Sequence, residues 1–377
     1  MSRYDGPIVD VDVHHRPKHD LELVDYLPER WRDYVRAGGR STFPVLPPDS
    51  GVGDLTPGGG DDRFAPDGSR PGSDYQTLRD QVLDPFNVYR AILTHNVGQF
   101  GAHHNPYYAA ALCSAANDWT IEQWLPRDER LTMLVATPFG QPEEAAREIR
   151  RIGGHPQVVG VLMSGNVLGR PLGDPIYDPI YEAAVETGLN ISVHINSSDR
   201  PSPIILSTGG AKDWTEYLSQ ASQQAMHYIS SLVVHGAFER FPSLHFLIKE
   251  FGIAWLPSLV WRLDDNYELL KLESPWLRRW PSEYIHDHIL LSTQPIEESP
   301  DRRQALVELL AAVDGVEDML CFSSDYPHAT MDEPGFVGRQ LPRVWHRKLF
   351  CENACNAYGW APPAHDWRVP TAAAAIS

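Results

Sequence analysis

The sequence has few cysteines and no long apolar run. Its 377 residues include four cysteines, Cys113, Cys321, Cys351 and Cys355, and no two of them have the Cys-x-x-Cys spacing of metal or redox sites. No stretch approaches the ~20 consecutive apolar residues that span a bilayer, and the first residues lack the apolar core of a secretory signal. We therefore expect a reduced, cytoplasmic protein without a disulfide framework.

Positive charge is also scarce. Lysine and arginine total 32 against 50 aspartates and glutamates, which gives a formal net charge of −18. Such a balance repels nucleic-acid phosphates and anionic lipid headgroups. We therefore expect no nucleic-acid and no membrane partner, and a small molecule as the ligand. The hydrophobic fraction of 42% and the charged fraction of 22% are typical of a globular chain.

Short apolar runs alternate with helical segments along the chain. The runs with strand character are residues 8–15, 89–94, 131–137, 158–163, 190–195, 244–250, 288–292 and 319–323. Eight such strand–helix units predict an α/β fold, a (β/α)8 TIM-like barrel that forms one domain over residues 1–377.

A long irregular stretch interrupts this rhythm after the first strand. It contains a short helical piece near residues 20–35, and its part 38–72 is crowded with glycine, proline and aspartate. Loops of this length are usually lids, binding loops or surface insertions. Residues 38–72 are therefore a candidate lid or, equally, a mobile insertion. The tail 371–377 is expected to fray.

The first strand carries a carboxylate and an imidazole near its end. Side chains two residues apart on a strand point to the same side, so Asp12 and His14 project together. A carboxylate and an imidazole at fixed spacing on a rigid element form half of a divalent-metal site. Asp10 lies on the same face but deeper, where a supporting role is expected.

Polar residues also stand at the ends of three later strands. His194 ends the fifth strand, Glu250 ends the sixth, and Asp325 follows the eighth. Each has an ordinary structural explanation, such as a satisfied core histidine or an aspartate in a turn. However, the carboxyl ends of barrel strands form the active-site face. Because these three residues all lie at that face, we expect them to form a single site together with Asp12 and His14 of the first strand.

Several runs together resemble one family. They are Val9-Asp10-Val11-Asp12-Val13-His14, Asn117-Asp118-Trp119, Val193-His194, Phe238-Glu239-Arg240-Phe241-Pro242-Ser243-Leu244-His245-Phe246-Leu247-Ile248, and Ser324-Asp325-Tyr326-Pro327-His328. This ordered set resembles the amidohydrolase-2 branch of the amidohydrolase superfamily, which includes the aminocarboxymuconate-semialdehyde decarboxylase-like enzymes. The resemblance implies a TIM-like barrel, a homodimer, and one divalent metal held by Asp12, His14, His194 and Asp325. Two imidazoles and two carboxylates suit Zn²⁺, the expected ion, or Mn²⁺ as the alternative.

One position departs from the family pattern. In the family's decarboxylases the sixth strand ends in a histidine that transfers a proton, whereas this chain has Glu250. A buried carboxylate beside a metal can still act as a general acid or base. The alternative is a buried ion pair of Glu250 with Lys249 or Arg262. His235, within a predicted helix, is interpreted as structural.

Other residues are candidates for contact with the substrate. His328 follows Asp325 closely and is expected to line the same opening of the barrel. His103 and His104 lie on the loop after the second strand, which also opens toward the active-site face. Arg16, just after the first strand, has the charge and geometry to bind a carboxylate. Alternatively, His103 and His104 belong to a solvent-exposed loop and do not contact the substrate.

The expected activity is that of a mononuclear metal-dependent decarboxylase, a carbon–carbon lyase, acting on a small carboxylated aromatic or unsaturated organic acid. The alternative is a metal-dependent hydrolase that cleaves an amide, ester, lactone or β-diketone bond with metal-bound hydroxide and Glu250. A second alternative is an inactive ligand-binding barrel. It predicts missing metal ligands, and all four are present.

Overall fold

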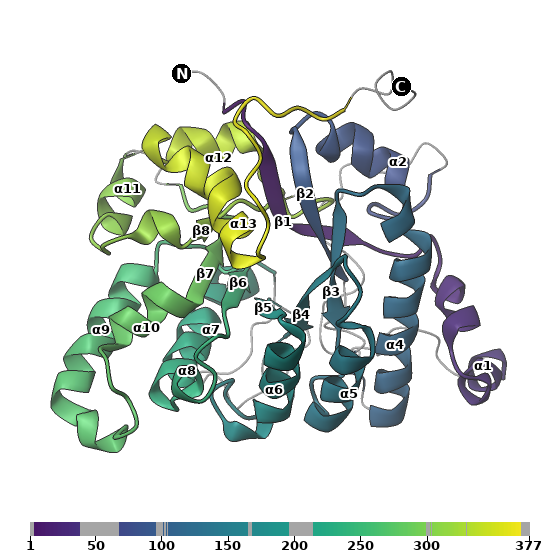
Figure 1. Cartoon of the computed structure of the whole chain (residues 1–377), viewed down its shortest axis with the longest axis horizontal. Helices are drawn as coiled ribbons and strands as arrows, with labels where there is room; N and C mark the ends of the chain where they lie inside the picture. The colour runs from purple at the N-terminus through teal and green to yellow at the C-terminus, as the bar shows by residue number, and fades with distance from the viewer. Residues whose placement is uncertain are drawn as a thin grey trace.

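Eight parallel strands form a barrel that helices surround on the outside (Figure 1). The computed structural model describes residues 4–37, 68–95, 101, 103, 105–164, 168–195, 214–298, 302, 304–328 and 330–370. The strands are β1 (Ile8–His15), β2 (Val88–His95), β3 (Leu131–Ala136), β4 (Val158–Met163), β5 (Asn190–His194), β6 (Phe246–Lys249), β7 (Ile289–Ser292) and β8 (Leu320–Cys321). They follow one another around the sheet in chain order.

The barrel closes where the chain after β8 meets β1. Neighbouring strands from β1 to β8 pair in parallel. Across the last seam the His14 amide donates to the Tyr326 carbonyl at 2.7 Å, and the Asp325 amide donates to the Asp12 carbonyl at 3.1 Å. The predicted (β/α)8 architecture is therefore confirmed, although β8 is shorter than expected and Asp325 lies beyond its end.

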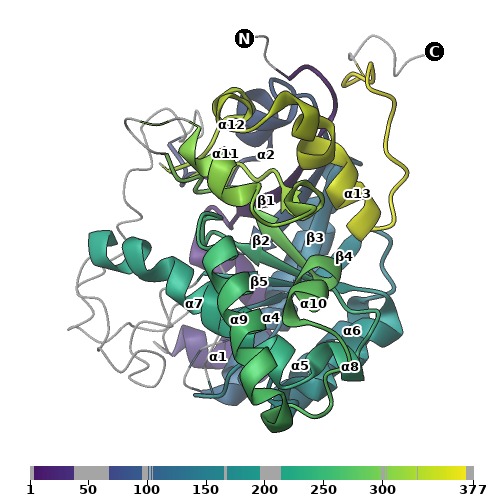
Figure 2. The same ribbon diagram turned by 90° about the vertical axis from the view of Figure 1, so that its left-hand side faces the viewer.

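Helices cover the barrel in the order expected for strand–helix units (Figures 1 and 2). The α-helices are α1 (Glu29–Arg36), α2 (Tyr75–Leu78), α4 (Pro106–Gln123), α5 (Pro142–Ile152), α6 (Asp178–Thr187), α7 (Trp214–Val234), α8 (Ala237–Arg240), α9 (Leu256–Leu270), α10 (Pro281–His288), α11 (Ala305–Leu310), α12 (Pro334–Gln340) and α13 (Asn353–Ala357). Short 3-10 helices cover Asp20–Tyr26, Leu125–Arg127, Pro175–Tyr177, Lys271–Glu273, Val316–Asp318 and Arg343–Trp345, and π-helical turns cover Arg79–Leu83 and Lys348–Glu352. None of the helices among the described residues is both long enough and apolar enough to cross a membrane.

The helix predicted over residues 215–238 is interrupted. α7 ends at Val234 because Gly236 adopts a φ of +71°, a conformation that glycine reaches without a steric penalty. A new short helix, α8, follows. His235 is therefore exposed at a break between helices rather than within one, and it precedes β6, so it lies at the barrel end opposite the carboxyl ends of the strands.

The insertion after β1 returns to the end of that strand. The Arg16 amide donates to the Gly72 carbonyl at 3.0 Å. A Cβ atom on Gly72 would lie 2.9 Å from the His14 carbonyl oxygen, so only glycine allows this approach. Residues 38–67 of the candidate lid, like the tail 371–377, lie outside the described residues. The helical piece expected near residues 20–35 is a 3-10 helix followed by α1.

A buried asparagine joins α4 to β3. Asn117 Oδ1 accepts from the Ala136 amide at 2.8 Å, and its Nδ2 donates to the Ala136 carbonyl at 3.0 Å and to Glu148 Oε1 at 2.7 Å. The asparagine satisfies both backbone groups of Ala136 at the end of the strand. This part of the family-like Asn-Asp-Trp run therefore has a structural role.

We predict that Asn117→Ala lowers the free energy of unfolding by about 1–3 kcal/mol, because it leaves buried backbone groups without partners. Urea denaturation measures the effect. The matched control is Asp118→Ala, which removes a half-exposed ion pair with Arg151 and is expected to cost under about 1 kcal/mol. Equal effects of the two substitutions would contradict the role assigned to Asn117.

Candidate metal centre

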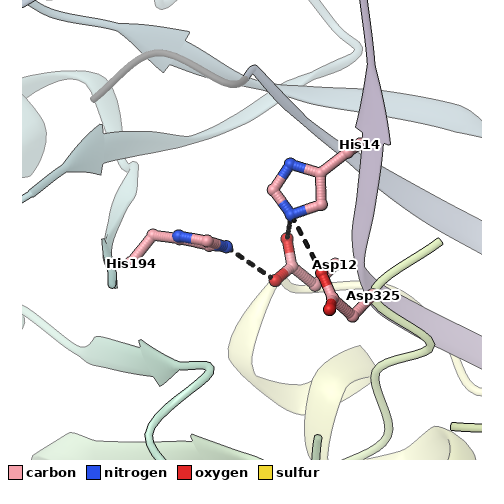
Figure 3. A group of neighbouring side chains, drawn as sticks. All are labelled: Asp12, His14, His194 and Asp325. Carbon is pink, nitrogen blue, oxygen red and sulfur yellow. Dashed lines mark ion pairs between the residues drawn. The ribbon is translucent and has the colours of Figure 1, made fainter. Parts of the chain in front are cut away.

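Two aspartates and two histidines converge at the carboxyl ends of the strands (Figure 3). Asp12 and His14 come from β1, His194 ends β5, and Asp325 follows β8. One ligand atom of each residue lies within 4.8 Å of those of the other three. His14 Nε2 is 3.2 Å from Asp325 Oδ1, and His194 Nε2 is 3.2 Å from Asp12 Oδ2.

These distances suit a metal ion. Donor atoms each about 2.0–2.2 Å from a tetrahedral ion lie roughly 3.3–3.6 Å apart. The nitrogens His14 Nε2 and His194 Nε2 are buried without a hydrogen-bond partner, which is costly unless a ligand satisfies them. His194 Nδ1 lies 2.6 Å from the Ile195 carbonyl oxygen. Donation to that carbonyl leaves Nε2 with the lone pair that a metal requires.

The environment prepares His14 and Asp12 for metal binding, whereas His194 must lose a proton to the incoming ion. Burial acts to lower the pKa of His194, but the charge of Asp12 outweighs burial and raises that pKa to about 9. Burial lowers the pKa of His14 to about 4, so its imidazole is neutral near pH 7. Burial acts to raise the pKa of Asp12, but the charges of Lys249, His194 and His14 outweigh it and hold that pKa well below its usual value. Asp12 is therefore ionised, as a ligand must be.

A carboxyl group stands beside the four donors. Glu250 Oε2 lies 3.4 Å from His194 Nε2, and the Glu250 amide donates to Ser292 Oγ at 3.1 Å. Its backbone has a φ of +63°, an uncommon conformation for a residue other than glycine. Burial raises the pKa of Glu250 to about 8, with a further contribution from the negative charge of Asp325. Glu250 can therefore hold a proton near neutral pH.

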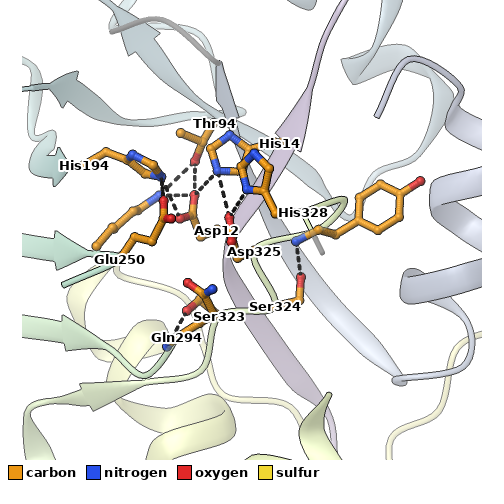
Figure 4. A network of polar contacts seen from close by, with 12 residues as sticks. Asp12, His14, Thr94, His194, Glu250, Gln294, Ser323, Ser324, Asp325 and His328 are labelled. Atoms are coloured by element: carbon orange, nitrogen blue, oxygen red, sulfur yellow. Dashed lines mark hydrogen bonds and ion pairs between the residues drawn. The ribbon is translucent and has the colours of Figure 1, made fainter. Parts of the chain in front are cut away.

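His328 belongs to the same cluster of side chains (Figure 4). Its Nδ1 lies 2.6 Å from Asp325 Oδ1, and its ring centroid is 4.5 Å from that of His14. Burial lowers the pKa of His328, but the charge of Asp325 outweighs it and raises the pKa overall. The charge of Arg16 acts in the opposite direction on this pKa, so Arg16 is close enough to His328 for their charges to interact.

The loop after β2 carries the other two expected contacts. His103 is buried; its Nδ1 accepts from the Asn105 amide at 3.0 Å, and its ring packs edge-on against Tyr108. These contacts fix the start of α4, where Asn105 caps the helix by accepting from two backbone amides. His104 lies outside the described residues.

The ion pairs considered from the sequence for Glu250 are wrong. Lys249 Nζ instead contacts Asp12 Oδ1 at 3.2 Å and Thr94 Oγ1 at 2.9 Å, and Arg262 is exposed. Sequence reasoning missed Lys249 and Thr94 as neighbours of the metal ligands. The available signal was a lysine closing an otherwise apolar strand, Phe246–Lys249, where a solvated charge is not expected.

The family model of amidohydrolases (Amidohydro_2) matches residues 10–360 of this chain. The chain belongs to this amidohydrolase family. The resemblance stated from the sequence runs is thereby confirmed.

Curated members similar to this amidohydrolase are decarboxylases. Gamma-resorcylate decarboxylase of Polaromonas sp. is 24% identical over 293 residues, 76% of this chain and 87% of the relative. The enzyme of the same name from Rhizobium sp. is 23% identical over 267 residues, 69% of this chain and 79% of the relative.

Solved structures share the fold of this amidohydrolase. A dihydroxybenzoic acid decarboxylase from Polaromonas sp., with bound manganese and 2-nitroresorcinol, has a TM-score of 0.64 and 19% identity, covering 94% of this chain and 97% of its own. A 5-carboxyvanillate decarboxylase from Novosphingobium aromaticivorans, with manganese and a nitrobenzoic acid, has a TM-score of 0.65 and 17% identity, with coverage of 94% and 97%. An amidohydrolase from Mycobacterium avium has a TM-score of 0.67 and 20% identity, covering 94% and 100%.

We predict that Asp325→Asn weakens metal binding more than about tenfold, because the amide removes a charge and an anionic donor from the centre. Elemental analysis of protein purified without added metal, followed by titration with Zn²⁺ and Mn²⁺, measures this. The control is Asp287→Asn, a half-exposed carboxylate on α10 paired with Arg279, which is expected to keep the wild-type metal content. Absence of metal from the wild-type protein after incubation with either ion would contradict the ligand assignment.

Proposed function

We propose that this amidohydrolase is a divalent-metal-dependent decarboxylase that removes CO2 from a small carboxylated aromatic acid. The observation that carries the proposal is the meeting of Asp12, His14, His194 and Asp325 with Glu250, a buried carboxyl group whose pKa burial raises to about 8. The curated relatives, which are gamma-resorcylate decarboxylases, support the same class of reaction.

The proposed roles follow from charge and position. Arg16 and His328 bind and orient the substrate carboxylate. Arg16 is cationic, and the raised pKa of His328 favours its cationic form. Glu250 donates its proton to the ring carbon as the carbon–carbon bond breaks. The electron pair of that bond stays with the ring carbon, so CO2 leaves and the glutamate becomes ionised. A bound divalent metal would polarise a substrate oxygen and stabilise the charge that develops on it.

Zn²⁺ is the ion expected from the donor set, and Mn²⁺ is the alternative. Two nitrogen and two oxygen donors accept either ion. The manganese named for two structural neighbours supports Mn²⁺. Elemental analysis of the purified protein distinguishes the two ions.

Hydrolysis is the second candidate, favoured by one observation. Glu250 stands where the family's decarboxylases have a histidine, and its carboxylate lies 3.4 Å from His194 Nε2. In its ionised form it could take a proton from an attacking water molecule. Incorporation of ¹⁸O from labelled water into an amide or lactone product would favour this reaction, whereas CO2 release from carboxylated aromatics favours decarboxylation.

We predict that Glu250→Gln lowers kcat for CO2 release by about 10²–10⁴-fold with unchanged metal content, because glutamine has the size of glutamate but no transferable proton. A panel of hydroxylated and methoxylated benzoic acids, monitored for CO2, provides the assay. Glu182→Gln, an exposed carboxylate on α6, serves as the control and is expected to retain full activity. Full activity of Glu250→Gln would remove Glu250 from the mechanism.

We also propose that the protein forms a homodimer. Exposed apolar residues gather at the end of α9 and on the segment that leads to α10; they are Leu269, Leu270, Leu272, Trp276 and Trp280, with exposed fractions of 80%, 51%, 88%, 47% and 46%. Such clusters commonly mark association sites. Multi-angle light scattering is expected to give twice the chain mass of 42.3 kDa, and a concentration-independent monomer would contradict it. The four buried free thiols support the expected cytoplasmic location.

A further inference from the structure

A lysine inside the barrel contacts one oxygen of a metal ligand. Lys249 ends β6 and is fully buried. Its Nζ lies 3.2 Å from Asp12 Oδ1 and 2.9 Å from Thr94 Oγ1, and Thr94 Oγ1 donates to the same Oδ1 at 2.6 Å. Figure 4 shows Thr94 and Asp12 at the centre of this network, between His194 and His14. The family resemblance assigned no role to this lysine.

The two oxygens of Asp12 therefore have different surroundings. Oδ1 accepts hydrogen bonds from the lysine ammonium and the threonine hydroxyl and lies 3.8 Å from His14 Nε2, whereas Oδ2 lies closer to a histidine nitrogen, 3.2 Å from His194 Nε2. A metal ion and an ammonium group repel one another and compete for the same lone pairs. An ion held by His194 and Asp12 consequently reaches Oδ2, while Oδ1 is occupied by its protein donors.

We propose that Lys249 is a positioning residue that makes Asp12 a one-oxygen ligand and thereby keeps the coordination number of the metal low. The proposal rests on the metal centre proposed above. A carboxylate that binds through both oxygens adds a donor and favours ions of high coordination number. Zn²⁺ accepts four donors readily, whereas Mn²⁺ suits sites with six. Lys249 thus shifts the selectivity of the centre toward Zn²⁺.

A merely structural role for Lys249 predicts a different result. Loss of a buried partner of Asp12 would then disturb the site and weaken all ions alike. Removal of a positive charge would likewise change the affinity for every divalent ion by a similar factor. The ratio of the two dissociation constants cancels both effects, so it reports on coordination alone.

The test uses the full chain, freed of metal by a chelator, as wild type and as Lys249→Met. Dissociation constants for Zn²⁺ and Mn²⁺ are measured by competition with a chelating indicator. In Lys249→Met, Asp12 Oδ1 loses the ammonium that repels the ion and keeps Thr94 Oγ1 as a donor, so a lone pair of Oδ1 becomes available to the ion and the preference for Zn²⁺ over Mn²⁺ is expected to fall about tenfold. The visible absorption of the Co²⁺-loaded variant is expected to weaken, as it does when coordination number rises.

Two comparisons complete the design. Lys249→Gln removes the charge but supplies an amide donor on a side chain one bond shorter, and it is expected to give a ratio between those of the wild type and Lys249→Met. Thr94→Val removes the other donor to Oδ1 and leaves the lysine in place, so a shift of less than about threefold is expected. Circular dichroism verifies that each variant is folded.

The proposal is overturned by an unchanged Zn²⁺ to Mn²⁺ ratio in folded Lys249→Met. It is also overturned by a weak, six-coordinate Co²⁺ spectrum in the wild type, a result that depends on no variant. Failure of the wild type to bind any of these ions would overturn the metal centre itself, and with it the proposed function. The two failures are therefore distinguishable.

Discussion

The closure of the barrel between β1 and the segment after β8 is the constraint on which the site depends. Asp10, fully buried, accepts from the Ser324 amide at 2.9 Å and from the Asp12 amide at 3.2 Å. The Asp325 amide then donates to the Asp12 carbonyl. These hydrogen bonds of the backbone amides thus fix Asp12 and Asp325, two proposed metal ligands from opposite ends of the chain, in one register. Asp325 has a φ of +61°, an energetically unfavourable conformation that the hydrogen bonds of this seam hold in place.

Charge balance is the second requirement of the centre. Two ionised carboxylates buried without compensation would cost several kcal/mol each. The ammonium group of Lys249 pairs with Asp12. The imidazole of His328 forms a hydrogen bond with Asp325 and pairs with it as a cation when it is protonated. Each aspartate therefore has its own protein partner before a metal binds. This arrangement explains how the cluster stays compatible with a folded apolar barrel.

Much of the fold and of the metal centre could be predicted from the sequence, for definable reasons. Runs such as Val158–Met163 are apolar throughout, because strands of a parallel barrel are covered on both faces. α5 begins with a proline, has acidic residues in its first turn and basic residues in its last, so its limits could be read directly. Strand ends were likewise recognisable, and they identify residues that share one face of the barrel.

Contacts across the barrel interior could not be read in the same way. Lys249 and Asp12 are 237 positions apart, and no local pattern states that one side chain reaches the other. Sequence reasoning consequently considered Lys249 only as an alternative ion-pair partner of its neighbour Glu250. The break between α7 and α8 was missed for a related reason: a single glycine within an amphipathic pattern ends a helix only when tertiary packing favours the left-handed conformation.

The presence of a glutamate at position 250, where the family resemblance predicts a histidine, has a consequence for substrate charge. An ionised glutamate beside Asp325 would repel a carboxylate substrate, whereas burial and that same aspartate raise the pKa of Glu250 to about 8 and favour its neutral form near pH 7. With Glu250 neutral, a divalent ion and Lys249 together outweigh the charges of Asp12 and Asp325. The centre would then carry net positive charge and attract an anionic acid. The burial that would make Glu250 a proton donor in the proposed reaction would therefore also favour binding of its anionic substrate.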